Sequence, residues 1–333
     1  MQQFDPGADD DALDACYRLY LAGALHDDPG GAPESPASLR YWWTNSSGGQ
    51  RQQAWLAADA AGPAGCYLLE LPERDNVGTG FLLLAVPPAR RRRGIGSALL
   101  AHASGQARQA GRTLLAGTAL AGSPGDAFAA AAGGRAGLVD VRRILTVEPE
   151  LPGRLARLRA QAESAAAGYT LLEWRGPVPA EHREGIAAVM SAMSDAPRDD
   201  TIEPDRWDAE RVRQEGDGLA RHGMQLFSAA ARLTSSGELA ALSQAVLDPA
   251  APGWAFQAVT AVARQYRGHR LGLLVKTALY QRLLAADPSV SRFTTVNAEA
   301  NEHMIAINEA MGYHAERSYH SWELTCRPES LPA

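Results

Sequence analysis

The sequence lacks the features that mark membrane, secreted and nucleic-acid-binding proteins. No apolar run reaches the roughly 18 residues that would predict a transmembrane helix. The first residues, 1–5, do not show the basic and then apolar order of a signal peptide. The formal net charge is −6, whereas a nucleic-acid-binding protein needs a cationic face. We therefore expect a cytoplasmic protein with neither a membrane nor a nucleic acid as its partner.

Cysteine and lysine are both scarce. The three cysteines, Cys16, Cys66 and Cys326, are far apart and odd in number, which favours a reduced protein over a disulfide scaffold. The histidines show no metal-ligand spacing with cysteine or carboxylate residues, so we expect no metal. No Ser/His/Asp set with a recognisable nucleophile turn argues for a hydrolase. Lysine occurs only at Lys276, and we attribute this to a composition rich in alanine and arginine, without a bearing on mechanism.

The length and the apolar content are sufficient for two domains. The 333 residues suit two domains of about 150 residues each, and the 46% of apolar residues allow each a core. We place a first domain at 1–150, a linker helix at 151–168 and a second domain at 169–333. The first half is expected to form helices at 11–25, 96–110 and 126–132 and strands at 53–59, 65–71, 79–86, 112–119 and 138–147. The second half is expected to form helices at 155–167, 181–193, 207–222, 271–286 and 302–311 and strands at 169–174, 225–233, 239–247, 254–262, 292–296 and 317–325.

Each half contains an arginine–glycine turn between a strand and a long helix. The separation of the turn glycines Gly96 and Gly272 is a domain length and too long for a solenoid period. The first helical N–H groups lack intrahelical partners and lie at the positive end of the helix dipole, so such a turn favours an anion. Glycines let the backbone approach a phosphate, and arginines add charged donors. The first turn offers Arg91, Arg92, Arg93, Gly94, Ile95 and Gly96 for this purpose.

Other interpretations of the first turn remain open. A dinucleotide site would need a third glycine, where Leu99 stands, and an acidic residue that the following strand does not contain. The arginine run 90–93 could also serve as a nuclear-localisation or nucleic-acid patch. A solvated run of arginines at a helix start is the simplest alternative. We favour a site for the pyrophosphate of coenzyme A.

The first turn, with Arg91, Gly94 and Gly96 in the order Arg-x-x-Gly-x-Gly, resembles the acetyl-CoA signature of the GNAT acyltransferases. The second turn is similar and carries Arg270 where the signature has its first glycine, a side chain that we expect the turn to tolerate with a negative φ. The resemblance implies that the end of a strand and this turn bind acetyl-CoA through Val262, Arg267, Gly268, His269, Arg270, Leu271 and Gly272. The tandem arrangement also resembles that of mycothiol synthase and other actinobacterial double-GNAT proteins.

The second half matches more of the family pattern than the first. Asn301 stands at the position of a cofactor-contacting asparagine, and Gly312-Tyr313 matches a Gly-Phe pair. Asn308 stands where the family often has a tyrosine that protonates the leaving thiolate. The first half has Ala129 at that position and no matching asparagine. We therefore expect catalysis in the second half and a degenerate or structural role for the first.

The resemblance implies a mixed α/β (α+β) fold of two GNAT domains, each with a mostly antiparallel central sheet that opens as a V between its fourth and fifth strands and is flanked by helices. It also implies direct attack of a small-molecule amine on the thioester of acetyl-CoA. The position of a glutamate base in some relatives is Phe256 in the second half and Gly80 in the first. Glu299 is our candidate base, and Asn308 and Tyr313 are the further catalytic candidates.

Several alternatives accompany this hypothesis. The chain could be a non-catalytic acyl-CoA-binding sensor, or an acyltransferase that uses another acyl-CoA or a hydroxyl acceptor. We expect a monomer in which the two halves form an internal pseudo-dimer, with a homodimer as the alternative.

Overall fold

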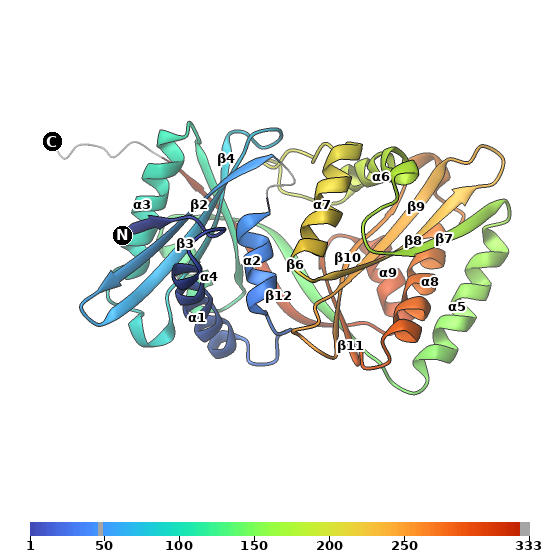
Figure 1. The fold of residues 1–333 in the computed structure, drawn as a ribbon, viewed down its shortest axis with the longest axis horizontal. Helices are drawn as coiled ribbons and strands as arrows, with labels where there is room; N and C mark the ends of the chain where they lie inside the picture. Colours follow the sequence, from blue (N-terminus) through green and yellow to red (C-terminus); the bar gives the residue numbers. More distant parts are fainter. Residues whose placement is uncertain (46–48, 327–333) are drawn as a thin grey trace. The chain divides into compact units, whose positions relative to one another are not determined.

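The structure is a computed structural model that describes residues 1–45 and 49–326 (Figure 1). The chain forms two compact units. The first unit comprises residues 1–140, 199–203 and the segment that begins at Ser318, and the second comprises residues 141–198 and 204–317. Within the described ranges, no helix is both long and apolar enough to cross a membrane.

The first unit is a sheet flanked by helices. Polar caps begin its first two helices: Asp9 accepts a hydrogen bond from the N–H of Ala12, and Ser35 accepts one from the N–H of Ser38. The helices are α1 (Asp10–Asp27), α2 (Pro36–Thr44), α3 (Ile95–Gln109) and α4 (Pro124–Ala131). The strands that lie wholly before residue 140 are β1 (Gln2–Phe4), β2 (Gln50–Asp59), β3 (Gly62–Pro72), β4 (Thr79–Ala85) and β5 (Leu114–Leu120).

The sheet of the first unit has the strand order β1-β2-β3-β4-β5-β12, where β12 is His314–Thr325. Its neighbours are antiparallel except for β4 and β5, which run parallel. Within these fully described strands, β4 and β5 pair only over 79–81 and 114–116. The two middle strands therefore separate after three residues, which confirms the expected V.

The second unit repeats this arrangement. Its helices are α5 (Leu151–Ala165), α6 (Arg183–Met190), α7 (Ala209–Arg221), α8 (Leu271–Ala286) and α9 (Glu302–Met311). Its strands include β7 (Tyr169–Arg175), β8 (Gln225–Leu233), β9 (Leu239–Leu247), β10 (Trp254–Val262) and β11 (Arg292–Ala298). The order is β6-β11-β10-β9-β8-β7, with β6 at Arg135–Thr146. Parallel pairing of β10 with β11 covers residues 254–256 and 292–294.

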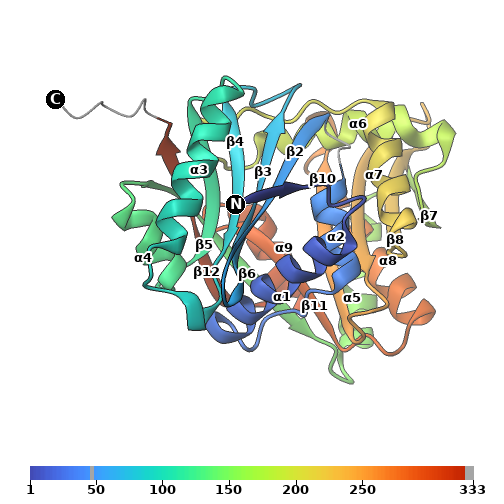
Figure 2. The ribbon, with the colours of Figure 1, turned by 60° about the vertical axis from the view of Figure 1, so that its left-hand side comes forward.

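Each unit receives a strand from the other half of the sequence. In the first unit, Tyr319–Thr325 of β12 pair with Leu114–Leu120 of β5 (Figure 2). In the second unit, β6 lies beside β11, and residues 141–146 of β6 belong to that unit. The compact units therefore do not coincide with the sequence halves 1–150 and 169–333. The helix expected as a linker is α5, which contributes Leu151, Leu155 and Ala162 to the core of the second unit.

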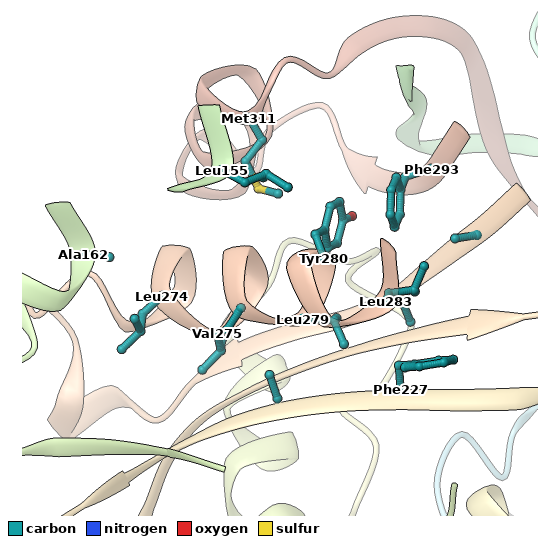
Figure 3. Packing of buried hydrophobic residues seen from close by; sticks show 14 of the residues in the cluster. Leu155, Ala162, Phe227, Leu274, Val275, Leu279, Tyr280, Leu283, Phe293 and Met311 are labelled. Carbon is teal, nitrogen blue, oxygen red and sulfur yellow. The ribbon is translucent and has the colours of Figure 1, made fainter. Parts of the chain in front are cut away.

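Apolar clusters cover both faces of the second sheet. On one face, α8 and α5 pack on the strands, and the rings of Tyr280 and Phe293 stack with centroids 4.0 Å apart (Figure 3). On the other face, α6 and α7 supply Ile186, Val189 and Val212 to a second cluster. The sheet is thus packed on both faces, and its middle strands β10 and β11 pair over three residues before they separate.

The pattern of the sequence predicted most elements. The strands at 225–233, 239–247 and 254–262 and the helices at 271–286 and 302–311 occur with the expected bounds. Two elements, β1 with three residues and α2, are not among those predicted. The start of α2 had a readable signal, because Ser35 is its N-cap and Pro36 its first residue.

The exchanged strands predict that the sequence halves cannot fold alone. A fragment of residues 1–150 lacks β12, so the edge of β5 would be left without its seven paired residues. We expect this fragment to show no cooperative thermal transition by circular dichroism. Co-expression with a fragment of residues 151–333 should restore a transition like that of the full chain. A cooperative transition of the isolated fragment would contradict the dependence on β12.

Candidate functional site

The two arginine–glycine turns share one backbone conformation. In each, a 3-10 turn follows the strand, at Pro88–Arg90 after β4 and at Arg264–Tyr266 after β10, and a residue in the left-handed region then begins the helix. The first helical hydrogen bonds run from the N–H of Ala98 to the carbonyl of Gly94 and from the N–H of Leu274 to the carbonyl of Arg270. The N–H groups of the first helical residues before Ala98 and Leu274 therefore have no partner within the helix and can bind a ligand. Both turns therefore present the same row of donors at a helix start.

Each turn contains two residues with positive φ. In the first turn they are Arg92 (φ 61°) and Gly94 (φ 77°), and in the second Gly268 (φ 89°) and Arg270 (φ 53°). The expectation that Arg270 keeps a negative φ is therefore wrong. The turn geometry imposes the left-handed conformation at both positions, and each turn satisfies it with one glycine and one strained arginine, in opposite order.

The signature arginines are held by aspartates. Arg91 donates from Nε to the carbonyl of Val86 at 3.0 Å and from both terminal nitrogens to Asp27 at 2.7 Å. Arg267 repeats this arrangement with the carbonyl of Val262 at 3.3 Å and with Asp195 at 2.7 Å. These arginines stabilise the turn by joining it to a carbonyl at the end of the strand or just after it and to an aspartate. The exposed side chains that remain for an anion are Arg92, Arg93, His269 and Arg270.

Arg264 also binds Asp195, at 2.8 Å. Hydrogen bonds from Arg264 and then Arg267 lower the pKa of Asp195, which keeps this carboxylate ionised. The bracing of the second turn therefore persists over the neutral pH range.

The opening beside β10 differs from its counterpart in the first unit. The register between β9 and β10 shifts between Gln257 and Val259, so β10 carries a bulge that the pairing of β3 with β4 lacks. Thr295 of β11 donates to the carbonyl of Gln257 at 3.2 Å, at the point where the parallel pairing has ended. Phe256, at the expected glutamate position, is 40% exposed. The site thus has an apolar side chain where a base could have been.

Helix α9 begins beside this opening. Asn301 is its N-cap, and the side-chain oxygen accepts from the N–H of Met304 at 3.3 Å. Glu299 lies in the preceding turn and is exposed, and His303 is exposed on the first turn of the helix. Asn301 therefore has a structural role in addition to the cofactor contact that the resemblance implies, and Glu299 stays a predicted base.

Two predicted catalytic residues lie inside the second unit. Tyr313 is 4% exposed, its hydroxyl is bonded to that of Tyr280, and burial raises its pKa far above the ordinary value. This places Tyr313 in the core rather than at an open surface. Asn308 is fully buried, accepts a hydrogen bond from the Nζ of Lys276 and donates from Nδ2 to Asn297 at 2.7 Å.

Lys276 and Asn297 are not among the predicted site residues. Lys276 is 1% exposed within α8, and burial lowers its pKa to about 7. A signal was present, because an ionisable residue in the apolar helix sequence LGLLVKTALY has to be buried or exceptional. Among the residues that the structure describes, no set of three histidine, cysteine or acidic side chains is arranged to hold a metal ion.

The strained arginine of the second turn allows a stability test. Arg270→Gly should stabilise the protein by about 1 kcal/mol relative to Arg270→Ala, because both remove the side chain and only glycine relieves the positive φ. Denaturant unfolding measures the difference. The matched change Gly268→Ala should destabilise by a similar amount, since its Cβ would meet no atom within 4 Å and only φ is strained. Equal stability of Arg270→Gly and Arg270→Ala would contradict this account.

Burial of Lys276 predicts a pH-dependent stability. The folded pKa of about 7 lies below the ordinary 10.5, so between these values the unfolded state binds the additional proton. The free energy of unfolding should therefore rise with pH from 7 to 9, by up to about 1.4 kcal/mol per pH unit. Below pH 7 this contribution is constant. In Lys276→Met this part of the slope should disappear, and an identical pH dependence of both proteins would contradict the burial of an ionisable amine.

Known proteins show the same architecture. A family model described as an acetyltransferase (GNAT) domain matches residues 50–131. No curated protein sequence matches the chain significantly. A solved tandem GNAT protein from the clavulanic acid biosynthesis pathway is 27% identical, with a TM-score of 0.80 and 98% of each chain covered. A GCN5-related N-acetyltransferase from Sphaerobacter thermophilus is 17% identical, with a TM-score of 0.65 over 94% of this chain and 92% of that chain, and shows the fold alone.

The matched segment 50–131 contains the first turn, the helix that it begins and α4. The similarity to the tandem structure extends over both repeats and thus includes the second turn. Together with the two splayed sheets, these findings show that residues 50–131 match a GNAT acetyltransferase domain and that the chain has the architecture of a tandem GNAT protein.

Proposed function

We propose that the protein is an acetyl-CoA-dependent N-acetyltransferase that acts on a small-molecule amine through its second unit. The observation that carries this proposal is the combination, in one unit, of the donor-rich turn at the start of α8, the bulged strand β10 and the opening between β10 and β11. The first unit has the turn and the opening but lacks the bulge.

In this proposal the second turn holds the pyrophosphate. The N–H groups at the start of α8 point to the anion, and the helix dipole favours negative charge there. His269 and Arg270 add exposed donors. An ideal Cβ on Gly272 would lie 3.3 Å from Ile307 and 3.5 Å from Val262, so a larger side chain would fill the space beside the helix start. Val262, Gly268 and Leu271 shape the same turn.

The reaction requires the amine nitrogen to attack the thioester carbonyl carbon while the carbon–sulfur bond breaks and the electron pair stays on sulfur. The amine proton has to leave, and Glu299 is the proposed acceptor, directly or through water. The bulge in β10 supports stabilisation of the thioester oxygen by a backbone N–H, because a bulge turns such a group away from the ladder. Asn301 is proposed to act on the acyl-CoA side of the site, whereas Asn308, which is fully buried, is proposed to act there through a neighbouring side chain.

A similar protein supports the choice of acyl donor. The tandem GNAT structure from the clavulanic acid pathway is named in its form without AcCoA, which pairs that protein with acetyl-CoA. Its 27% identity covers 98% of this chain. We extend acetyl-CoA to this chain as a proposal, and we propose a monomer with an internal pseudo-dimer.

A non-catalytic acyl-CoA-binding protein is the second candidate. The specific observation in its favour is the absence of an ionisable side chain at Phe256 together with the position of Tyr313 in the core. Both candidates require acyl-CoA binding. Release of CoA thiol with a panel of amino sugars, polyamines, amino acids and peptide N-termini separates them.

Acetyl-CoA should stabilise the folded protein. A ligand that binds only the native state raises the free energy of unfolding by about 2.7 kcal/mol at a concentration one hundred times its Kd. Thermal melts with and without acetyl-CoA measure this effect. No shift at millimolar acetyl-CoA, together with no heat of binding in calorimetry, would rule out the proposed function.

A glutamate in each turn tests which unit catalyses. Gly272→Glu should reduce turnover about a hundredfold or more, because its carboxylate repels the pyrophosphate. Gly96→Glu should mainly reduce the stoichiometry of CoA binding or the stability. Gly272→Ala is the steric control, and circular dichroism has to show that all variants are folded. Loss of turnover in folded Gly96→Glu with normal turnover in Gly272→Glu would assign catalysis to the first unit.

A further inference from the structure

A polar chain crosses the core of the second unit. It begins at Lys276, the only lysine of the protein, whose side chain is 1% exposed on α8. The Nζ donates to the side-chain oxygen of Asn308, and it lies 5.1 Å from the ring centre of Tyr313 and 5.9 Å from that of Tyr280. Among the described residues, Lys276 forms no ion pair with a carboxylate, and burial is the one cause of its lowered pKa. The amine is therefore held by an amide and two aromatic rings alone.

The chain continues from α9 to the end of β11. Asn308 is fully buried, and its Nδ2 donates to the oxygen of Asn297 at 2.7 Å. A side-chain amide accepts through one end and donates through the other, whereas a lysine ammonium can only donate. In its protonated form, Lys276 therefore fixes the oxygen of Asn308 toward itself, and Asn308 in turn fixes the oxygen of Asn297.

Asn297 forms the outer end of this polar chain, and its side-chain N–H groups are free to donate. Asn297 is partly exposed, and among the described residues its Nδ2 has no acceptor. Asn297 lies two residues beyond Thr295, whose hydroxyl bridges to Gln257 after the pairing of β10 and β11 has ended. The N–H groups of Asn297 therefore lie on the separated part of β11.

The first unit has the same fold without a counterpart of the polar chain formed by Lys276, Asn308 and Asn297. Leu100 stands in the position of Lys276 when the turn glycines Gly96 and Gly272 are aligned. Ala129 stands in the position of Asn308, because both residues accept the same helix-end hydrogen bond. The carbonyl of Ala129 accepts from the N–H of Gly134, and the carbonyl of Asn308 accepts from the N–H of Tyr313. The fold therefore does not need these polar groups.

Asn297 has an apolar counterpart as well. The parallel pairing begins at Leu114 in β5 and at Arg292 in β11. When these two residues are aligned, Ala119 stands in the position of Asn297. All three members of the chain are thus replaced together in the first unit. A buried amine without a counterion is costly, so its retention in one unit only indicates a role in the site.

We propose that Lys276 is a positioning residue that orients Asn308 and, through it, presents the amide N–H groups of Asn297 to a carbonyl oxygen of the pantetheine arm of acyl-CoA. This inference rests on the proposed function, because the arm has to enter the opening between β10 and β11. The pantetheine arm carries two amide carbonyls, which are hydrogen-bond acceptors. The fixed donor contributes binding without rotation of the asparagine on arrival of the ligand.

Calorimetry with two probes tests this proposal. The first probe is CoA, and the second is 3′-phosphoadenosine 5′-diphosphate, which keeps the pyrophosphate and lacks the pantetheine arm. The measurements use the full chain with Gly96→Glu, so that only the second turn binds. Lys276→Met should raise the Kd of CoA between about twofold and tenfold and leave the Kd of the second probe unchanged. Leu100→Met, the matched change in the first unit, should change neither.

Asn308→Asp is the second variant, in case Lys276→Met does not fold. An aspartate keeps a partner for Lys276 but cannot donate to Asn297, so Asn297 should rotate and present its oxygen instead of its N–H groups. CoA binding should weaken at least as much as in Lys276→Met, again with an unchanged second probe. Asn297→Ala combined with Lys276→Met should bind CoA no more weakly than Asn297→Ala alone, because both changes remove one interaction.

The outcomes separate the two proposals. Failure of the parent protein to bind CoA contradicts the proposed function. Normal CoA binding by the parent and by both folded variants overturns the role of Lys276 alone. Equal weakening of both probes also overturns it, because that result indicates a general structural defect rather than an oriented donor.

Discussion

The short parallel pairing between the two middle strands is the constraint on which the site depends. In the second unit, β10 and β11 pair over three residues, and the bulge between Gln257 and Val259 then turns β10 out of register. Separated strands leave backbone groups without ladder partners, and such groups are stable only with water, a side chain or a ligand. The hydroxyl of Thr295 satisfies one of them, the carbonyl of Gln257. The opening is therefore a consequence of strand geometry, and packing on both sheet faces maintains it.

The turns show how a backbone requirement is met by different residues. Each needs two left-handed positions, and each has one glycine and one arginine there in opposite order. The departure of the second turn from the family signature is thus a shift of the glycine from one left-handed position to the other. Bracing by aspartate is the same in both, with Asp27 for Arg91 and Asp195 for Arg267. The repeat is conserved at the level of conformation and contact more than of residue identity.

The core of the second unit contains polar groups that include two of the predicted catalytic residues. Tyr313 packs in the core against Tyr280, and Asn308, predicted at the position of the thiolate-protonating tyrosine, joins Lys276 to Asn297. The scarcity of lysine in the sequence gave no indication of a role for Lys276. Its burial and its bond to Asn308 give the single lysine a specific environment that composition could not indicate.

The local elements and the two turns can be predicted from the sequence, because they depend on neighbours along the chain. Periodicity set the bounds of strands such as β8 and β9, and the arginine–glycine pattern identified both helix starts. Which strand completes which sheet follows from long-range packing, since the pairing of β12 with β5 joins residues about 200 positions apart and no local pattern encodes the partner. The φ of Arg270 and the burial of Lys276 also depend on the folded environment. A side chain's conformation and partners are set by what packs around it, and those neighbours come from α9 and β11 rather than from the adjacent sequence.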